Sequence, residues 1–280
     1  MDDPIARAER LRLRAEAEAD PALAAEAVAL LHDIPRAQQA AVALPLSAAL
    51  RALGALTDDL DALDSAVVLA REAVRTAPAP RAHAVLGAAL TVLGERAGDP
   101  DLLAEALGAY EAAGAGFAAA GAALDQGRME RNRGAVLTLL ATVLDDRSLL
   151  VEAAVALRTA RAMFAALGEP REAGLAADNL CHGLRLLGAR SGDPALLAEA
   201  VAAGRAALAV TPPEAPPWQR AMTETNLANA LAALGGPRRT EAVALYRAAL
   251  GRLDGAAAAA QRATVRHNLW LVERAAAGDP

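Results

Sequence analysis

The stretch Gly98-Asp-Pro-Asp-Leu-Leu-Ala-Glu-Ala106 decides how this chain folds, because it returns almost unchanged as Gly192-Asp-Pro-Ala-Leu-Leu-Ala-Glu-Ala200. Each part of it has a mechanical meaning. Gly can end a helix in the left-handed conformation, Asp caps the start of the next helix, and Pro suits the first helical position. The stretch therefore predicts a helix stop followed at once by a helix start.

Looser copies of this phrase recur along the chain at the spacing of a helical repeat. The residue before the final Ala stands at positions 26, 65, 105, 152, 199 and 241, so the intervals are 39, 40, 47, 47 and 42. The final Ala is present in all six copies, and in five of them another Ala follows seven residues later, on the same helical face. Each copy thus predicts a helix, called B below, with one face of small residues.

A second helix, called A, is expected before most B helices. It carries a pair of residues whose second member is always small, which fits a close contact between helices. Cys181 belongs to such a pair, so we interpret it as a small packed residue. The pairs are Leu46-Ser47, Leu86-Gly87, Arg133-Gly134, Leu180-Cys181 and Leu227-Ala228.

Periodicity, caps and prolines together predict helices throughout the chain. Their expected ranges are 5–18, 20–32, 36–55, 59–76, 80–96, 99–123, 126–144, 146–167, 169–190, 193–210, 216–234, 237–253 and 257–276.

The composition agrees with an all-α protein and narrows the classes of function. Hydrophobic residues make up 55% of the chain but aromatics only 2%, and the abundant Ala and Leu favour helix. The formal charge of −6 and the lack of aromatic stacking platforms argue against a nucleic-acid binder. The single Cys excludes an internal disulfide. We find no signal peptide and no apolar run long enough for a membrane span, so the expectation is a soluble cytoplasmic protein.

The segment Asn226-Leu227-Ala228-Asn229-Ala230-Leu231, with Gly235 and then Ala242, Tyr246 and Ala249, resembles a tetratricopeptide repeat. The Gly-Asp-Pro phrase is also similar to repeat arrays of actinobacterial CHAT-associated proteins, and the Lys-free composition fits a GC-rich genome of that kind. The resemblance implies a right-handed α-solenoid of about six degenerate helix pairs plus a C-terminal capping helix. We expect one repeat domain over residues 1–280.

Motifs for catalysis are not found in the sequence. The four His form no His-x-x-x-His pair, and neither a Gly-x-Ser-x-Gly elbow nor a phosphate-binding loop occurs. Acidic pairs such as Asp58-Asp59 and Asp145-Asp146 are interpreted as helix caps. The sequence predicts no catalytic residue, no cofactor and no metal site, and hence no enzyme.

A binding surface is the better hypothesis. In tetratricopeptide proteins certain positions of helix A point into a concave groove, and the resemblance implies that the matching positions here would bind a protein or peptide. Their arginines suit an acidic or C-terminal segment. The positions are Arg81, Arg128, Arg131, Asp178, His182, Arg185, Thr225, Asn229 and His267.

Several alternatives remain open at this point. The arginines could simply solvate helix faces. A regulatory sensor that binds a small molecule or signalling peptide, and an unrecognised enzyme on a helical-repeat fold, are the other two functions. Self-association through the end helix, at Leu269, Trp270 and Leu271, is compatible with all three. We also expect Asn132, Asn179, Asn226 and Asn268 to bond to backbone between adjacent repeats.

Overall fold

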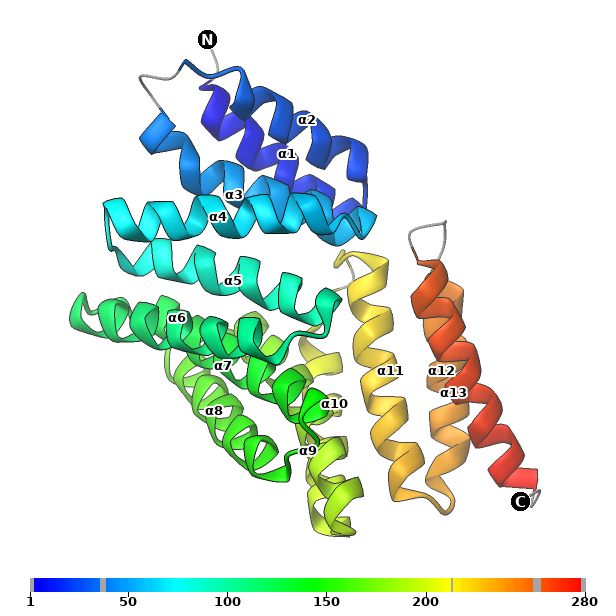
Figure 1. Cartoon of the computed structure of the whole chain (residues 1–280). Coiled ribbons are helices and arrows are strands. Elements are labelled where there is room, and N and C mark those ends of the chain that lie inside the picture. Colours follow the sequence, from blue (N-terminus) through cyan, green and yellow to red (C-terminus); the bar gives the residue numbers. More distant parts are fainter. Residues whose placement is uncertain (1–2, 36–38, 213, 254–257, 278–280) are drawn as a thin grey trace. The chain divides into compact units, whose positions relative to one another are not determined.

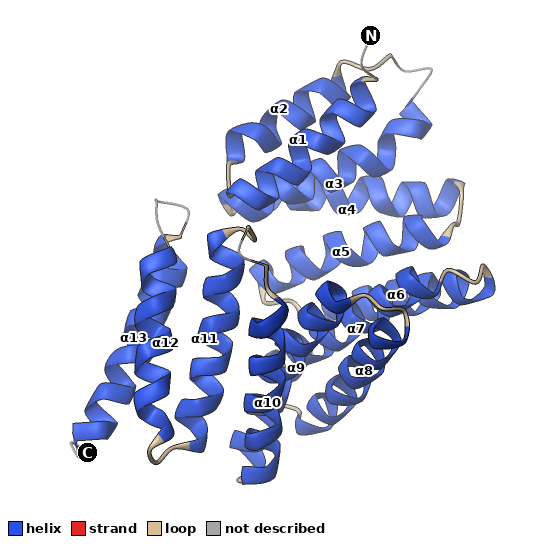
Figure 2. Ribbon diagram, turned by 180° about the vertical axis from the view of Figure 1, so that it is seen from behind, coloured by secondary structure: helices blue, strands red, loops and turns tan. Residues whose placement is uncertain are grey.

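The computed structural model describes residues 3–35, 39–212, 214–253 and 258–277, and the regular structure within them is helical throughout (Figure 2). They divide into two compact units, residues 1–144 and residues 145–280. The first unit holds α1 (Pro4–Glu18), α2 (Pro21–His32), α3 (Gln39–Thr57), α4 (Leu60–Thr76), α5 (Pro80–Ala97), α6 (Pro100–Ala119) and α7 (Ala123–Val143). The second holds α8 (Arg147–Ala166), α9 (Pro170–Ser191), α10 (Pro194–Val210), α11 (Pro217–Leu234), α12 (Arg238–Arg252) and α13 (Ala259–Ala277).

Within each unit the helices pack in chain order (Figure 1). Every helix contacts the next one, and alternate helices touch as well, α1 with α3, α3 with α5 and α5 with α7 in the first unit. In the second unit α9 contacts α11, and α11 contacts α13. Stacked hairpins of this kind are the arrangement of an α-solenoid, so the predicted all-α repeat fold is confirmed. A single domain over residues 1–280 stays a prediction, because each unit is described by itself.

The helix starts follow from the repeated phrase as predicted. In five copies the Asp has extended backbone geometry, and its side chain accepts a hydrogen bond from the backbone N–H two residues later. Gly98 and Gly192 take the left-handed conformation, with φ of 64° and 66°. The capping residues are Asp20, Asp59, Asp99, Asp146 and Asp193.

Two expectations about helix ends were wrong. The helix expected over 99–123 ends at Ala119, and the next begins at Ala123, because Gly121 turns the chain with φ of 68°. Asp58 and Asp145 do not cap helix starts; each takes a left-handed φ, a conformation that favours Gly, and accepts an ion pair from Arg96 or Arg190. Gly278 and residues 36–38 lie outside the described residues.

The small residues of the B helices are the centre of the packing. All six final Ala residues of the phrase have 0% exposure. In the second unit one apolar cluster runs from Ala154 on α8 to Val272 on α13, with Leu180, Leu184 and Tyr246 among its larger members. The paired A-helix positions are equally buried: Ser47 and Cys181 have 0% exposure, and the Ser47 hydroxyl donates to the carbonyl of Ala66. Among the described helices, none combines the length and apolarity needed to cross a bilayer.

Gly87 tests how tightly these helices meet. A Cβ at this position would lie 2.9 Å from Cε1 of the Tyr110 ring on α6, closer than real contacts allow. We expect Gly87→Ala to lower the free energy of unfolding by about 1–3 kcal/mol. The control is Gly108→Ala, since a Cβ at Gly108 meets nothing within 4 Å; it should stabilise the helix by roughly 0.5–1 kcal/mol. Urea unfolding followed by circular dichroism measures both. Equal effects would contradict the close contact.

Candidate functional site

Three of the predicted groove residues lie in the unit of residues 1–144. Arg81 on α5 is exposed, and Arg128 and Arg131 on α7 are half-buried. Arg128 is paired with Asp125 on its own helix, with Nη1 3.0 Å from Oδ1. Arg131 donates to the side-chain oxygen of Asn132 at 3.4 Å. Both half-buried arginines therefore have acceptors within their own helix.

The other unit brings a set of predicted residues together. Asp178, His182 and Arg185 follow one another at spacings of four and three on α9, so they share one face of that helix. Asn226 of α11 contacts Asp178, and Asn229 follows it three residues later on the same helix, which packs against α9. We call these five residues the α9–α11 face.

Hydrogen bonds between side chains join this face to its neighbours. The amide of Asn226 donates to Oδ2 of Asp178 at 3.1 Å, which links α11 to α9. The side-chain oxygen of Asn229 accepts from the Tyr246 hydroxyl at 2.6 Å and from the amide of Asn268 at 3.0 Å. Asn226 and Asn268 thus do connect adjacent repeats, but the expected backbone partners were wrong, because the acceptors are side chains.

Burial shifts the pKa of Asp178, the acidic residue of this face. Desolvation raises the pKa of Asp178 to about 6, although the Asn226 amide and the Thr223 hydroxyl oppose the shift. The second carboxylate oxygen, Oδ1, is shut off from solvent and has no hydrogen-bond partner among the described residues. A buried acceptor without a donor is uncommon in folded proteins and calls for a physical reason.

Burial also shifts the pKa values of the two basic side chains of this face. Burial, and then the charge of Arg185, lower the pKa of His182 to about 4, so this imidazole is neutral at neutral pH. Burial also lowers the pKa of the Arg185 guanidinium. Its Nε is buried and bonds to nothing in the described part of the chain. The face therefore presents an acid, a neutral imidazole and a cation along one helix.

Thr225 and His267 are placed differently. Thr225 is only 7% exposed, and its hydroxyl donates to the carbonyl of Ala221 at 2.7 Å, one turn earlier in α11. His267 is exposed on α13 and stacks on Trp270, with ring centroids 6.1 Å apart. The guanidinium carbon of Arg274 lies 4.9 Å from the centre of the same indole. These three side chains form a surface cluster on the last helix.

Cys181 is packed inside the unit as the sequence predicts. Its burial raises the pKa of the thiol to about 12, which leaves it almost entirely protonated and unreactive at neutral pH. No group of three or more His, Cys, Asp or Glu side chains within the described ranges is arranged to hold a metal ion.

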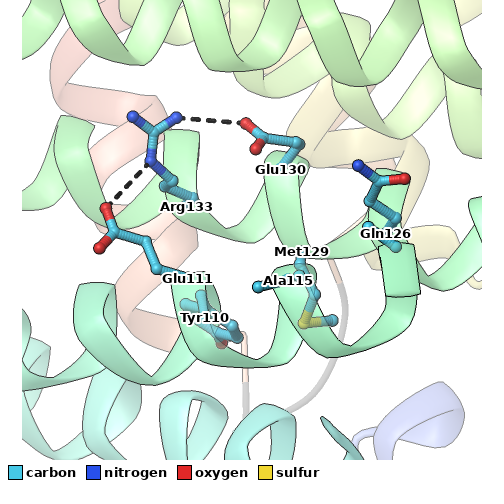
Figure 3. Close-up of a pocket in the computed structure, with 9 residues that line it drawn as sticks. Tyr110, Glu111, Ala115, Gln126, Met129, Glu130 and Arg133 are labelled. Atoms are coloured by element: carbon cyan, nitrogen blue, oxygen red, sulfur yellow. Dashed lines mark hydrogen bonds and ion pairs between the residues drawn. The ribbon is translucent and has the colours of Figure 1, made fainter. Parts of the chain in front are cut away.

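A separate pocket of about 330 Å³ lies between α6 and α7 (Figure 3). Its apolar lining comes from Tyr110, Gly114, Ala115, Ala118 and Met129. Its polar lining is Glu111, Gln126, Glu130 and Arg133, and the guanidinium of Arg133 lies between the two carboxylates. This pocket was not among the predicted sites.

The second unit has a groove of about 320 Å³ at the equivalent place, where α8, α9 and α10 meet. Ala165, Ala173, Gly174, Ala177 and Val210 make most of it apolar. Arg161 and Glu169 are its charged residues.

Comparison with known proteins assigns no family to the chain. No protein-family model matches it, and no curated protein is similar enough to count as a relative. Among solved structures, BtubC (BKLC) from P. vanneervenii has a TM-score of 0.45 and 18% identity over 93% of this chain and 91% of its own. A circular tandem repeat protein with novel repeat topology and enhanced subunit contact surfaces has a TM-score of 0.32 and 17% identity, over 96% of this chain and 69% of its own. At these low scores neither likeness indicates a function.

Proposed function

We propose that this chain is a protein-interaction scaffold whose α9–α11 face binds a carboxylate-bearing segment of a partner, rather than an enzyme. The observation that supports this most is Arg185. Its side chain is half-buried, its Nε has no partner among the described residues, and no carboxylate there forms an ion pair with it. A desolvated cation without a counter-charge is costly unless something else pairs with it.

A carboxylate suits this position for chemical reasons. Guanidinium groups bind carboxylates through two parallel hydrogen bonds, which adds geometric specificity to the charge attraction. His182, beside Arg185, is neutral at neutral pH and therefore does not compete for the anion. Asp178 sits seven residues away, which is about 10 Å along the helix at 1.5 Å per residue. The face can therefore bind one anionic group at Arg185.

The repeat type also belongs to this proposal. Small residues at the A-helix pairs, the buried Ala rows of the B helices and the contacts between alternate helices support tetratricopeptide-like hairpins. Helix-hairpin arrays of this kind use extended surfaces to bind partners. An acidic or C-terminal peptide segment is the partner that the chemistry of Arg185 favours.

Arg185→Glu tests the proposal. We expect the purified whole chain to bind a short fluorescein-labelled acidic peptide with a free C-terminal carboxylate, measured by fluorescence anisotropy. The variant should bind it roughly tenfold more weakly or worse, since hydrogen bonds to charged groups contribute about 1.5–3 kcal/mol.

The matched control is Arg147→Glu, which makes the same change of charge at an exposed position at the start of α8. It should leave the affinity within about twofold, since an exposed charge contributes little. Circular dichroism confirms that both variants keep their helices. The proposal fails if the parent chain does not bind the peptide, or if the two variants weaken binding equally.

A further inference from the structure

The α6–α7 pocket can be compared residue by residue with the groove between α8, α9 and α10, because 47 residues separate the two copies of the repeat. Arg133 occupies the position of Leu180, and Glu130 that of Ala177. In the remaining A-helix pairs this first position is also Leu, at 46, 86 and 227. At the Glu130 position the other copies hold Ala43, His83, Ala177 and Glu224, so it is Arg133 in place of Leu that distinguishes this junction from the rest of the repeats.

Arg133 does not replace Leu merely to keep the helix surface hydrated. Arg133 is 27% exposed, and it makes two ion pairs, one with Glu130 one turn earlier on α7 at 3.2 Å and one across the pocket with Glu111 of α6 at 3.6 Å. Glu111 is 64% exposed, and 3.6 Å is a long contact, so its carboxylate is held loosely. Two carboxylates around one guanidinium leave the pocket with a net charge of −1. An added cation is attracted there, while an added anion would have to displace a carboxylate from Arg133.

The floor of the pocket suits an alkyl chain. Met129 of α7 is almost fully buried, and so is Tyr110 of α6, the helix that also contributes Ala115 and Ala118. A volume of about 330 Å³ is at the lower end of the range for small-molecule sites, roughly 300–1,000 Å³. It suits one long side chain better than a large ligand. Lys and Arg side chains combine an apolar stem with a charged end, as this lining requires.

We propose that the α6–α7 pocket binds a lysine or arginine side chain of a partner polypeptide, with the alkyl stem against Met129 and the charge paired with the carboxylates of Glu111 and Glu130. This site lies in the unit of residues 1–144 and does not depend on the α9–α11 face. The loosely held Glu111 turns toward the incoming cation, while Arg133 keeps the two carboxylates apart in the free protein. The amide of Gln126 offers a further acceptor at the edge.

The chain carries its own reporter for this pocket, since Met129 is one of only four Met residues. We expect N-acetyl-lysine N-methylamide to shift the ¹³C-methyl NMR signal of Met129 saturably in the whole chain, with a millimolar dissociation constant. Met163 and Met222, on α8 and α11, should not move and act as internal controls. The matching glutamate amide should leave Met129 unchanged. No response to the lysine amide, or a saturable response to the glutamate amide alone, overturns the proposal.

Two variants and one control test whether the carboxylates of the pocket bind the cation. Glu111→Gln combined with Glu130→Gln should weaken binding of the lysine amide roughly fivefold or more, since each exposed ion pair is worth up to about 1 kcal/mol. Glu72→Gln with Glu95→Gln makes the same charge change at exposed sites outside the pocket and should have no effect. Arg133→Leu, which installs the residue found in the other repeats, should fold normally and bind the cation several-fold more tightly. Weaker binding by Arg133→Leu would contradict the proposed role of the carboxylates.

Discussion

Replacing both Arg220 and Arg252 with Met should lower the free energy of unfolding of the unit formed by residues 145–280 by about 3–5 kcal/mol. The reason is Glu224 on α11, whose side chain is only 4% exposed. Nε of Arg252 lies 3.1 and 3.0 Å from its two oxygens, and Nε of Arg220 lies 3.2 Å from one of them. Without both arginines the buried carboxylate loses the two counter-charges that the described part of the chain gives it. Urea unfolding of the whole chain measures the loss.

The control adds Glu224→Met to the same two substitutions. Three apolar side chains should then recover most of the lost stability, because an apolar replacement of a whole buried ion group is often neutral or better. Glu224→Met alone should cost less than the double arginine variant, since Arg220 and Arg252 are 31% and 40% exposed and can turn to water. A triple variant as unstable as the double one would show that packing, not the stranded charge, causes the loss.

The helices and their starts could be predicted because the decisive signals are local. An Asp before a leucine pair carries its own hydrogen bond to the following N–H groups, so its effect does not depend on distant residues. Ala in six copies of the phrase marks a contact face that the structure buries completely. The end of α6 was missed because residues 117–124 are almost all Ala and Gly, and Ala favours helix whether or not the chain turns there.

The Glu before the final Ala has a role that the sequence analysis did not predict. In three copies of the phrase this Glu forms an ion pair with an Arg of the preceding B helix. That Arg stands six residues after the residue that is equivalent to the Glu in its own helix. Arg71 pairs with Glu105, Arg158 with Glu199, and Arg205 with Glu241. The spacing was visible in the aligned repeats, but the contact joins different helices and depends on how they stack.

For the polar sites, too, helical spacing predicts which residues share a face but not which side chains they contact. Helical spacing places Asp178, His182 and Arg185 on one side of a helix, and all three lie within α9. Spacing could not show that Asn226 would take up one oxygen of Asp178 and leave the other unbonded. The α6–α7 pocket also had a signal in the sequence, since Arg133 stands alone among leucines at the first position of the A-helix pairs. Its two acidic partners come from packing.

Asp178 and His182 should give stability two opposite dependences on pH. The pKa of Asp178 is about 6 in the folded chain against an ordinary 3.8, so the folded state binds more protons and loses stability as pH rises from about 4 to 6. The pKa of His182 is about 4 against 6.5, so the folded state binds fewer protons and gains stability as pH rises over nearly the same range. In the parent chain the two slopes largely cancel.

Single substitutions should reveal each slope. Asp178→Asn keeps an oxygen for Asn226 and removes the buried charge; relative to the parent chain we expect no change near pH 4 and a gain of about 2 kcal/mol at pH 7, a figure reduced for partial solvent access. His182→Gln should do the reverse, with no change at pH 7 and a similar gain near pH 4. Urea unfolding across this range measures both. Differences that do not vary with pH would mean that neither group titrates abnormally, and the unpaired acceptor at Asp178 would then need another cause than its buried charge.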